Sequence, residues 1–332
     1  MGASAAGFVS LPATSQGLRR LVALSGAVAL LACASLALAV TPSGTVPCTP
    51  EHVNDHDPDL ARVSDALVCF KAYLSNFDTD KSSADGSGKD ILGIPHWVIQ
   101  HVHKAKRSPE SRKRPRAWFT VPALEAAGFA PTDDSYHFSQ HFRANHSNWY
   151  ERGHLAQKYL AERLGKSAGW FTHNVANAVP QRAQFNKGPW LSLECLTGAW
   201  ANEYGDVWVI AGPIFVSGHP SKWLKSDMNK KALPVAIPTM LFKIVVRKAV
   251  DGSWIALAFI YPQEDSSYKK RPWHESDRLT SVAQIEKLTG ETFFVDQSVK
   301  VSPPEKETAE RLWPIKKDYF DTGCRSMAKD IP

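Results

Sequence analysis

Three short stretches between residues 151 and 194 carry side chains that can do hydrolytic chemistry. Residues 151–154 read Glu-Arg-Gly-His, residues 177–181 read Asn-Ala-Val-Pro-Gln, and residues 186–190 read Asn-Lys-Gly-Pro-Trp, with Glu194 shortly after. Together they offer an imidazole, a guanidinium, carboxamides, and carboxylates at both ends. Hydrolysis of a phosphodiester needs a base to deprotonate water, a cation for the extra phosphoryl charge and hard oxygen ligands for a divalent metal. The set therefore indicates this chemistry.

The spacing of these residues predicts how the backbone would present them. Mg²⁺ prefers oxygen ligands and keeps several waters, so the carbonyl of Asn186 and substrate phosphate oxygens would form a site. Gly153 lets the backbone turn sharply, or approach a phosphate closely, just before His154. We expect Asn186 at a helix start, where Asn is a favoured cap, and Glu194 about two turns further along that helix.

Hydrophobic periodicity predicts the elements that must position these side chains. Apolar residues recur at helical spacing over 190–200, and two β-rich runs flank an Asp-Gly hairpin signal at 251–252. The expected elements are strands at 97–103, 207–210, 241–247 and 254–260, and helices at 190–200 and 281–288. The strand at 207–210 is expected to end before Gly212 and Pro213. With no internal repeat, this order predicts an α+β fold with a mixed, mostly antiparallel sheet core.

The composition is that of a globular protein with one local concentration of charge. The 332 residues are 43% hydrophobic and 22% charged, which argues against a disordered or coiled-coil chain. The formal charge is +6, and residues 104–116, with seven bases and the single acid Glu110, account for all of it. The chain is therefore not a globally basic wrapper of nucleic acid, and its positive field is local.

The N-terminal sequence predicts export. The first 50 residues carry no acid, Arg19 and Arg20 precede an uncharged apolar run over 21–40, and Ala-Leu-Ala at 37–39 forms a cleavage pattern. We expect residues 1–39 to be a cleaved signal peptide and the protein to be secreted or periplasmic. A retained membrane anchor, because about 20 apolar residues span a bilayer, and a mitochondrial location are the alternatives.

Composition also divides the rest of the chain. We expect residues 40–90 to be a linker and N-terminal extension, residues 91–300 to be the catalytic domain, and residues 301–332 to be a C-terminal extension.

Four cysteines remain once residues 1–39 are removed, namely Cys48, Cys69, Cys195 and Cys324. An even count in an exported chain suggests disulfides, and four cysteines allow three pairings. We expect the local pairing, with Cys48 bonded to Cys69 and Cys195 bonded to Cys324. No Cys-x-x-Cys sequence is present, which argues against a cysteine zinc site.

The ordered series of motifs resembles the DNA/RNA non-specific endonucleases of the ββα-metal type, which include secreted bacterial nucleases and mitochondrial endonuclease G. The family signature is Asp-Arg-Gly-His, then Asn-x-x-Pro-Gln, then Asn-x-x-x-Trp with a Glu eight residues after that second Asn. Order and internal spacing hold in this chain, and the likeness continues from near Pro95 to Asp296.

The resemblance implies a role for each residue. His154 would be the general base, Asn186 the single direct protein ligand to Mg²⁺, and Arg152 the stabiliser of the transition state. Asn177 would orient the site, and Glu194 would hydrogen-bond a water of the metal. Mn²⁺ is a candidate substitute for Mg²⁺. The products from DNA or RNA would carry 5′-phosphate and 3′-hydroxyl ends.

Two positions depart from the family pattern. Glu151 stands where the usual residue is Asp, and Gly198 stands where some members place a second active-site Arg. Compensating substrate contacts are expected from Arg182 and from the basic run, and the candidates there are Lys104, Lys106 and Arg107.

Relatives in this family often dimerise, so a homodimer is a candidate assembly, whereas nothing in the sequence identifies an inhibitor protein. Two other functions compete: a nucleic-acid-binding relative that has lost turnover, and a metal phosphodiesterase that acts on small nucleotides. The first is disfavoured because both His154 and Asn186 are present.

Overall fold

The computed structural model describes residues 44–48, 66–80, 91–104, 113–141, 150–294, 301–304 and 306–326. The expected signal segment at 1–39 lies outside these described residues, as do Lys106 and Arg107. In the described ranges, no helix is both long enough and apolar enough to cross a bilayer.

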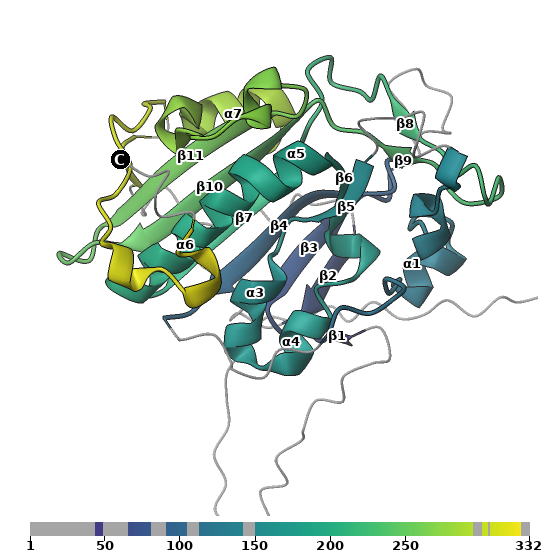
Figure 1. Cartoon of the computed structure of the whole chain (residues 1–332), viewed down its shortest axis with the longest axis horizontal. Coiled ribbons are helices and arrows are strands. Elements are labelled where there is room, and N and C mark those ends of the chain that lie inside the picture. Colours follow the sequence, from purple (N-terminus) through teal and green to yellow (C-terminus); the bar gives the residue numbers. More distant parts are fainter. Residues whose placement is uncertain are drawn as a thin grey trace, which may run out of the picture. The chain divides into compact units, whose positions relative to one another are not determined.

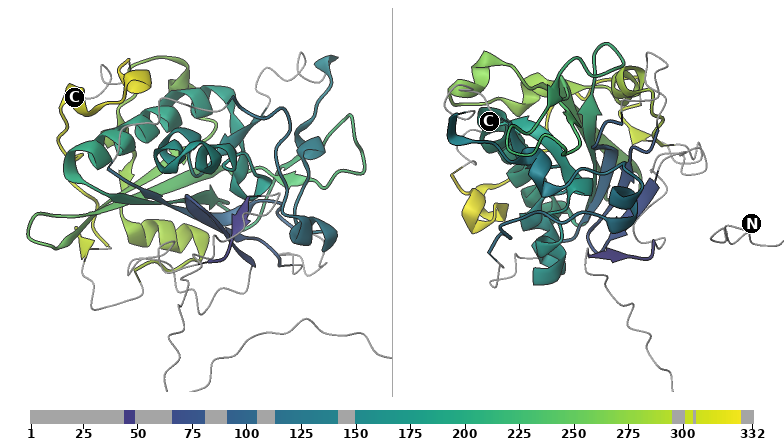
Figure 2. Two further views of the ribbon diagram at one scale, coloured as in Figure 1. Left: turned by 90° about the horizontal axis from the view of Figure 1, so that it is seen from below. Right: turned by 90° about the vertical axis from the view of Figure 1, so that its right-hand side faces the viewer.

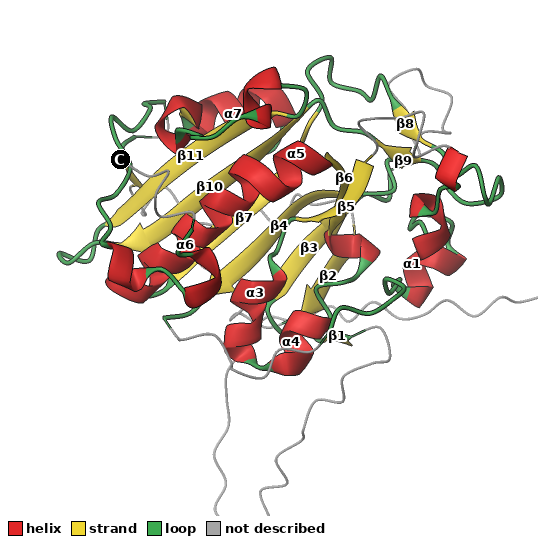
Figure 3. Ribbon diagram, in the orientation of Figure 1, coloured by secondary structure: helices red, strands yellow, loops and turns green. Residues whose placement is uncertain are grey.

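A nine-stranded sheet forms the centre of the described chain (Figures 1 and 3). The strands run in the order β1-β2-β3-β4-β7-β10-β11-β12 with antiparallel neighbours throughout, and β13 joins β11 in parallel. Their bounds are β1 Thr45–Val46, β2 Ala66–Phe70, β3 Tyr73–Phe77, β4 Pro95–Val102, β7 Val207–Ile214, β10 Met240–Lys248, β11 Trp254–Pro262, β12 Leu279–Thr280 and β13 Val301–Ser302. The predicted mixed, mostly antiparallel core is confirmed.

Two further strand pairs and several helices lie around this sheet. The pairs are β5 Tyr150–His154 with β6 Ala178–Arg182, and β8 Trp223–Leu224 with β9 Val235–Ala236. The α-helices are α1 Pro122–Ala126, α3 Lys158–Ala161, α4 Lys166–Trp170, α5 Ala183–Phe185, α6 Leu191–Tyr204 and α7 Val282–Thr289. Short 3₁₀ helices cover Asp133–Tyr136, Glu162–Leu164, Val175–Asn177, Ser266–Lys269, Glu275–Arg278, Lys317–Tyr319 and Thr322–Cys324, and a π-helical turn covers Asn186–Trp190.

Side-chain alternation along the strands creates two apolar layers, one on each face of the sheet. On β7, Val209 and Ala211 belong to the larger buried cluster, which also contains the apolar residues of α6. Ile210 and Ile214 belong to the smaller cluster, with Ile285 of α7. The left panel of Figure 2 shows α6 and α7 on opposite sides of the sheet.

Local signals account for the best-predicted elements. The β10–β11 hairpin turns at Gly252, whose φ of 84° is in the left-handed region that favours glycine. Helix α7 begins where the Ser281 hydroxyl accepts the N–H of Gln284, and it ends at Gly290, which has a φ of 77°.

Two boundaries differ from expectation. Strand β7 continues through Gly212 and Pro213 to Ile214. Glycine is needed at position 212 for packing within the sheet, because a Cβ there would overlap the carbonyl of His96 and the ring of Phe242. The sheet also begins before residue 91, since β3 pairs with β4 and β2 pairs with β3.

Two disulfides are present, with the expected pairings. Cys48–Cys69 links the end of β1 to β2, and Cys195–Cys324 ties α6 to the C-terminal segment. That segment also packs on α6 through Trp313, whose ring meets Trp200 edge-on at 5.0 Å. The C-terminal segment therefore belongs to the same core as helix α6.

Removing the Cys195–Cys324 bond with serine at both positions should lower the free energy of unfolding by about 2–5 kcal/mol, because a long loop is freed in the unfolded chain. Urea unfolding followed by tryptophan fluorescence would measure this loss. The matched change at Cys48 and Cys69, which span 21 rather than 129 residues, should cost less. Equal stability of the wild type and both variants would contradict the expectation.

Candidate active site

Five of the predicted motif residues line one cavity of about 810 Å³, whereas Asn177 is not part of its lining. Strand β5, the π-helical turn and helix α6 supply its centre, and the segment before α1 supplies one wall. The motif residues in its lining are Glu151, Arg152, His154, Asn186 and Glu194.

Strands β5 and β6 place His154 beside the Asn-x-x-Pro-Gln motif. Gly153 pairs with Val179, and a Cβ at Gly153 would overlap the side chain of Gln181. Glycine is therefore required for close packing of the two strands, rather than for a sharp turn. Helices α3 and α4 lie between β5 and β6 in the sequence, and the helical run from α5 to α6 follows β6 directly.

Asn177 holds the backbone beyond His154. Its Oδ1 accepts the N–H of Ala156 at 2.7 Å, and its Nδ2 donates to the carbonyls of Ala156 at 2.8 Å and Thr172 at 3.0 Å. The side chain is fully buried, so these hydrogen bonds form without competition from water. Trp190 Nε1 also donates to the His154 carbonyl at 3.1 Å, which fixes the end of β5 against the helical run.

Asn186 lies inside the helical run, so the prediction that it caps a helix start is wrong. It is the C-cap of α5 and the first residue of the π-helical turn, which bends at Gly188 before α6. Its Nδ2 donates instead to Glu151 Oε2 at 2.9 Å, which leaves the carboxamide oxygen as the possible ligand for a cation. Glu151 also forms an ion pair with Lys187. The longer carboxylate at position 151 thus orients the amide of Asn186.

The His154 ring is enclosed by aromatic groups. Its centroid lies 4.6 Å from that of Trp118 and 4.9 Å from that of His173, which meets it edge-on. Burial lowers the pKa of His154 well below its ordinary value, and the neighbouring His173 and Arg114 lower it further. His154 is therefore neutral near pH 7 and able to accept a proton. Its Nε2 finds no hydrogen-bond partner among the described residues.

His173 is a cavity residue that the sequence analysis missed. Its Nδ1 lies 3.1 Å from the Trp170 carbonyl, and burial lowers its pKa to about 4. The available signal was a histidine four residues before Asn177, just ahead of the Asn-x-x-Pro-Gln motif.

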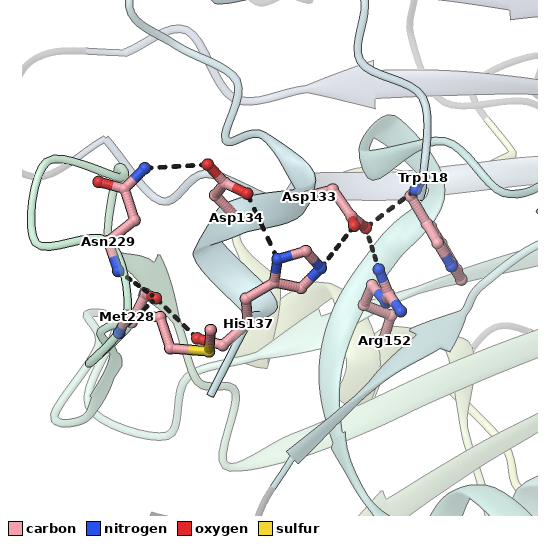
Figure 4. Close-up of polar contacts among 8 residues, drawn as sticks. Trp118, Asp133, Asp134, His137, Arg152, Met228 and Asn229 are labelled. Carbon is pink, nitrogen blue, oxygen red and sulfur yellow. Dashed lines mark hydrogen bonds and ion pairs between the residues drawn. The ribbon is translucent and has the colours of Figure 1, made fainter. Parts of the chain in front are cut away.

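Arg152 is held by an acidic residue from a distant segment (Figure 4). It forms an ion pair with Asp133, which also accepts the backbone N–H of Trp118 at 2.9 Å. His137 bridges this carboxylate, at 2.7 Å from Nε2, and that of Asp134, at 3.3 Å from Nδ1. The guanidinium also lies 5.5 Å from the centroid of the Trp118 ring. Arg152 is thus oriented at the cavity wall by residues that no motif contains.

Glu194 lines the cavity and interacts electrostatically with a buried lysine. The residue is 5% exposed, and burial raises its pKa to about 7. Lys243 of β10 lies with Nζ 4.0 Å from the Trp190 ring centroid, and burial lowers its pKa to about 8, while attraction to Glu194 and Glu275 opposes that shift. Lys243 is the cation that partly compensates the buried carboxylates.

Of the residues predicted to contact substrate, those that the structure describes do not line the cavity. Arg182 does not line the cavity and instead pairs with Glu264 at 2.9 Å. Lys104 does not line it either, and its backbone N–H donates to Asp206 at 2.8 Å. The basic run reaches the cavity at its other end, where two arginines, Arg114 and Arg116, form part of the lining.

Gly198 does not leave a gap where the family arginine would stand. Arg163 Nη2 donates to the Gly198 carbonyl at 3.0 Å and to Asp321 at 2.8 Å. A Cβ at Gly198 would lie 3.2 Å from that same nitrogen. The space is filled by an arginine that ties α6 to the C-terminal segment.

Comparison with known proteins identifies the relatives of this site. A family model described as DNA/RNA non-specific endonuclease matches residues 70–300. Mitochondrial nuclease EXOG of Mus musculus is 24% identical over 210 residues, covering 60% of this chain and 52% of its own. Mitochondrial endonuclease G of Homo sapiens is 28% identical over 137 residues, covering 39% and 45%. A nuclease of Syncephalastrum racemosum is 26% identical over 214 residues, covering 60% and 62%.

The chain thus spans about half the length of the EXOG relatives it matches. The fold also resembles a solved structure, the crystal structure of the EndoG/EndoGI complex, with a TM-score of 0.51 and 20% identity. That match covers 76% of this chain and 94% of the other, and it supports the same fold.

Replacing Asn177 with alanine should lower the free energy of unfolding by about 2–4 kcal/mol, because the buried N–H and carbonyl of Ala156 lose their partner. Asn177→Asp is the matched variant: it keeps an acceptor for Ala156 but turns a carboxylate oxygen toward two carbonyls, so it should cost at least as much. Urea titration measures both. An unchanged unfolding midpoint would show that Asn177 does not hold the segment.

Proposed function

The chain belongs to the DNA/RNA non-specific endonuclease family, and from this premise we propose that it is a Mg²⁺-dependent endonuclease acting on both DNA and RNA. The observation that carries the proposal is the convergence of His154, Arg152 and Asn186 on one cavity. The proposed products carry 5′-phosphate and 3′-hydroxyl ends.

The donor set around Asn186 suits a hard divalent cation. The Asn186 carboxamide oxygen is left available by the bond from its Nδ2 to Glu151, and Glu194 lines the same cavity two turns along the helix. Carboxamide and carboxylate oxygens are the ligands that Mg²⁺ prefers, and Mn²⁺ accepts them as well. When bound, such a cation would neutralise charge on the phosphate oxygens.

His154 and the solvent account for the proton movements. Neutral His154 takes a proton from water as the water oxygen bonds to phosphorus. The bond from phosphorus to the 3′ oxygen breaks, and that oxygen takes a proton from solvent to become the 3′-hydroxyl, while the phosphate stays on the 5′ side. His154 returns the proton it took to solvent, so the protons balance. Arg152, held by Asp133, is placed to offset the charge that develops on the phosphoryl group.

Export is the proposed route for this chain, with residues 1–39 as the signal peptide, on the strength of the apolar run at 21–40 and the Ala-Leu-Ala pattern. The EXOG and endonuclease G relatives are named as mitochondrial, so mitochondrial import is the alternative.

Plasmid nicking and RNA degradation by the purified chain, with Mg²⁺ or with EDTA, test the proposed function. We expect metal-dependent cleavage of both polymers, and a loss of about 10²–10⁴-fold in kcat for His154→Ala. His219→Ala, at an exposed histidine outside the cavity, is the matched control and should retain activity. DNA binding without cleavage would favour the binding relative, and equal cleavage of a dinucleotide and a long duplex would favour the small-nucleotide enzyme.

The arginines at the end of the basic run should set the salt dependence. Replacing Arg114 and Arg116 with alanine should raise KM for duplex DNA about tenfold at low salt and reduce the slope of log(kcat/KM) against log[salt] by about 2, one for each lost phosphate contact. Lys104→Ala should change neither quantity, because Lys104 does not line the cavity. An unchanged slope in the double variant would mean that these arginines do not contact phosphates.

A further inference from the structure

Two histidines and an aspartate meet where β4 ends and β7 begins. His101 is the next-to-last residue of β4, His103 follows the strand, and Asp206 precedes β7. One nitrogen of each imidazole and one carboxylate oxygen all lie within 4.8 Å of one another. His101 Nε2 is 3.4 Å and His103 Nδ1 is 3.8 Å from the same atom, Asp206 Oδ2.

This group lies on the opposite face of the sheet from the active-site cavity. Along β4, Val98 and Val102 join the buried cluster that contains α6, and Gln100 bonds to Gln157 in the cavity lining. Ile99 joins the other cluster, which contains α7. Because side chains alternate along a strand, His101 points to the same face as Ile99.

The surroundings hold these side chains in place before any ligand binds. Asp206 Oδ1 accepts the backbone N–H of Lys104 at 2.8 Å, which turns Oδ2 toward both imidazoles. The His101 ring stacks on Trp208, with centroids 4.5 Å apart and planes 16° apart. Supporting contacts of this kind orient the ligands in protein metal sites.

We propose that His101, His103 and Asp206 form a second metal site, which takes a divalent transition metal of the Zn²⁺ type. Two imidazoles and one carboxylate suit Zn²⁺, Co²⁺ or Ni²⁺, whereas Mg²⁺ prefers oxygen ligands alone. With bonds of about 2.0–2.1 Å, tetrahedral ligand atoms lie about 3.3 Å apart, so small side-chain rotations would close the present arrangement. The side chains are 21%, 34% and 42% exposed, which leaves room for water to complete the coordination.

A metal at this position would join the end of β4 to the connection between α6 and β7. The basic run starts at Lys104, directly after His103, and Arg114 near its other end lines the active-site cavity. The site would therefore anchor the base of that run from the face away from the catalytic residues.

Titration calorimetry with ZnCl₂ on the EDTA-stripped, dialysed full chain, in excess Mg²⁺, tests this proposal. We expect one Zn²⁺ equivalent to bind, and Co²⁺ to give visible absorption bands at the same stoichiometry. His103→Ala and Asp206→Asn should each weaken binding at least tenfold. His219→Ala, the exposed histidine control, and Asn186→Ala, in the catalytic cavity, should bind as the wild type does.

Urea unfolding of the metal-free variants shows whether they fold, so that weak binding is not mistaken for unfolding. Loss of the Zn²⁺ equivalent in His137→Ala, whose imidazole bridges Asp133 and Asp134, but not in His103→Ala would overturn the assignment. So would wild-type affinity in Asp206→Asn, or the absence of any Zn²⁺ binding by the folded chain.

Discussion

The buried carboxamide of Asn177 is the constraint on which the candidate active site depends. It joins the backbone just after His154 to the carbonyl of Thr172, in a place where no water can replace a lost hydrogen bond. The close packing of Gly153 against Gln181 acts in the same direction. Together these contacts hold β5 against β6. The His154 imidazole is therefore held in position relative to the helical run that follows β6.

Electrostatics in this region follow from burial. The same burial that keeps His154 neutral also raises the pKa of Glu194 and lowers that of Lys243, because charge is costly away from water. Opposite charges offset part of that cost: Glu194 and Glu275 attract Lys243, and Asp133 pairs with Arg152 at the cavity wall. Each buried charge at the site is thus offset by an opposite charge that comes from a different helix, strand or loop.

The sheet separates two kinds of ligand chemistry. Oxygen donors around Asn186 gather on the face covered by α6, whereas the imidazoles of His101 and His103 gather on the face covered by α7. A hard cation such as Mg²⁺ would therefore bind on the first face and a borderline cation such as Zn²⁺ on the second, because each prefers the ligand atoms found there. A layer of apolar strand residues lies between the two sites. The basic run begins beside the second group and ends at the first.

Sequence alone was enough for the features that depend on local pattern. The β10–β11 hairpin and helix α7 follow from turn residues and caps, and the disulfides present are the expected choice among the three pairings that four cysteines allow. The motif series likewise contains five residues of the cavity lining, Glu151, Arg152, His154, Asn186 and Glu194, whereas Asn177 lies outside that lining. Local pattern misplaced Asn186 as a cap, because the helical turn of α5 that precedes it is too short to leave a periodic signal.

Only the tertiary structure decided which distant groups meet. Asp133 reaches Arg152 and Lys243 reaches Glu194 across long separations in sequence, and Asp206 meets the histidines of β4 because β4 and β7 are sheet neighbours. The structure likewise turned Arg182 toward Glu264 rather than the cavity. Spacing along the chain carries no information about such encounters, because strand pairing and packing against a common core bring them about.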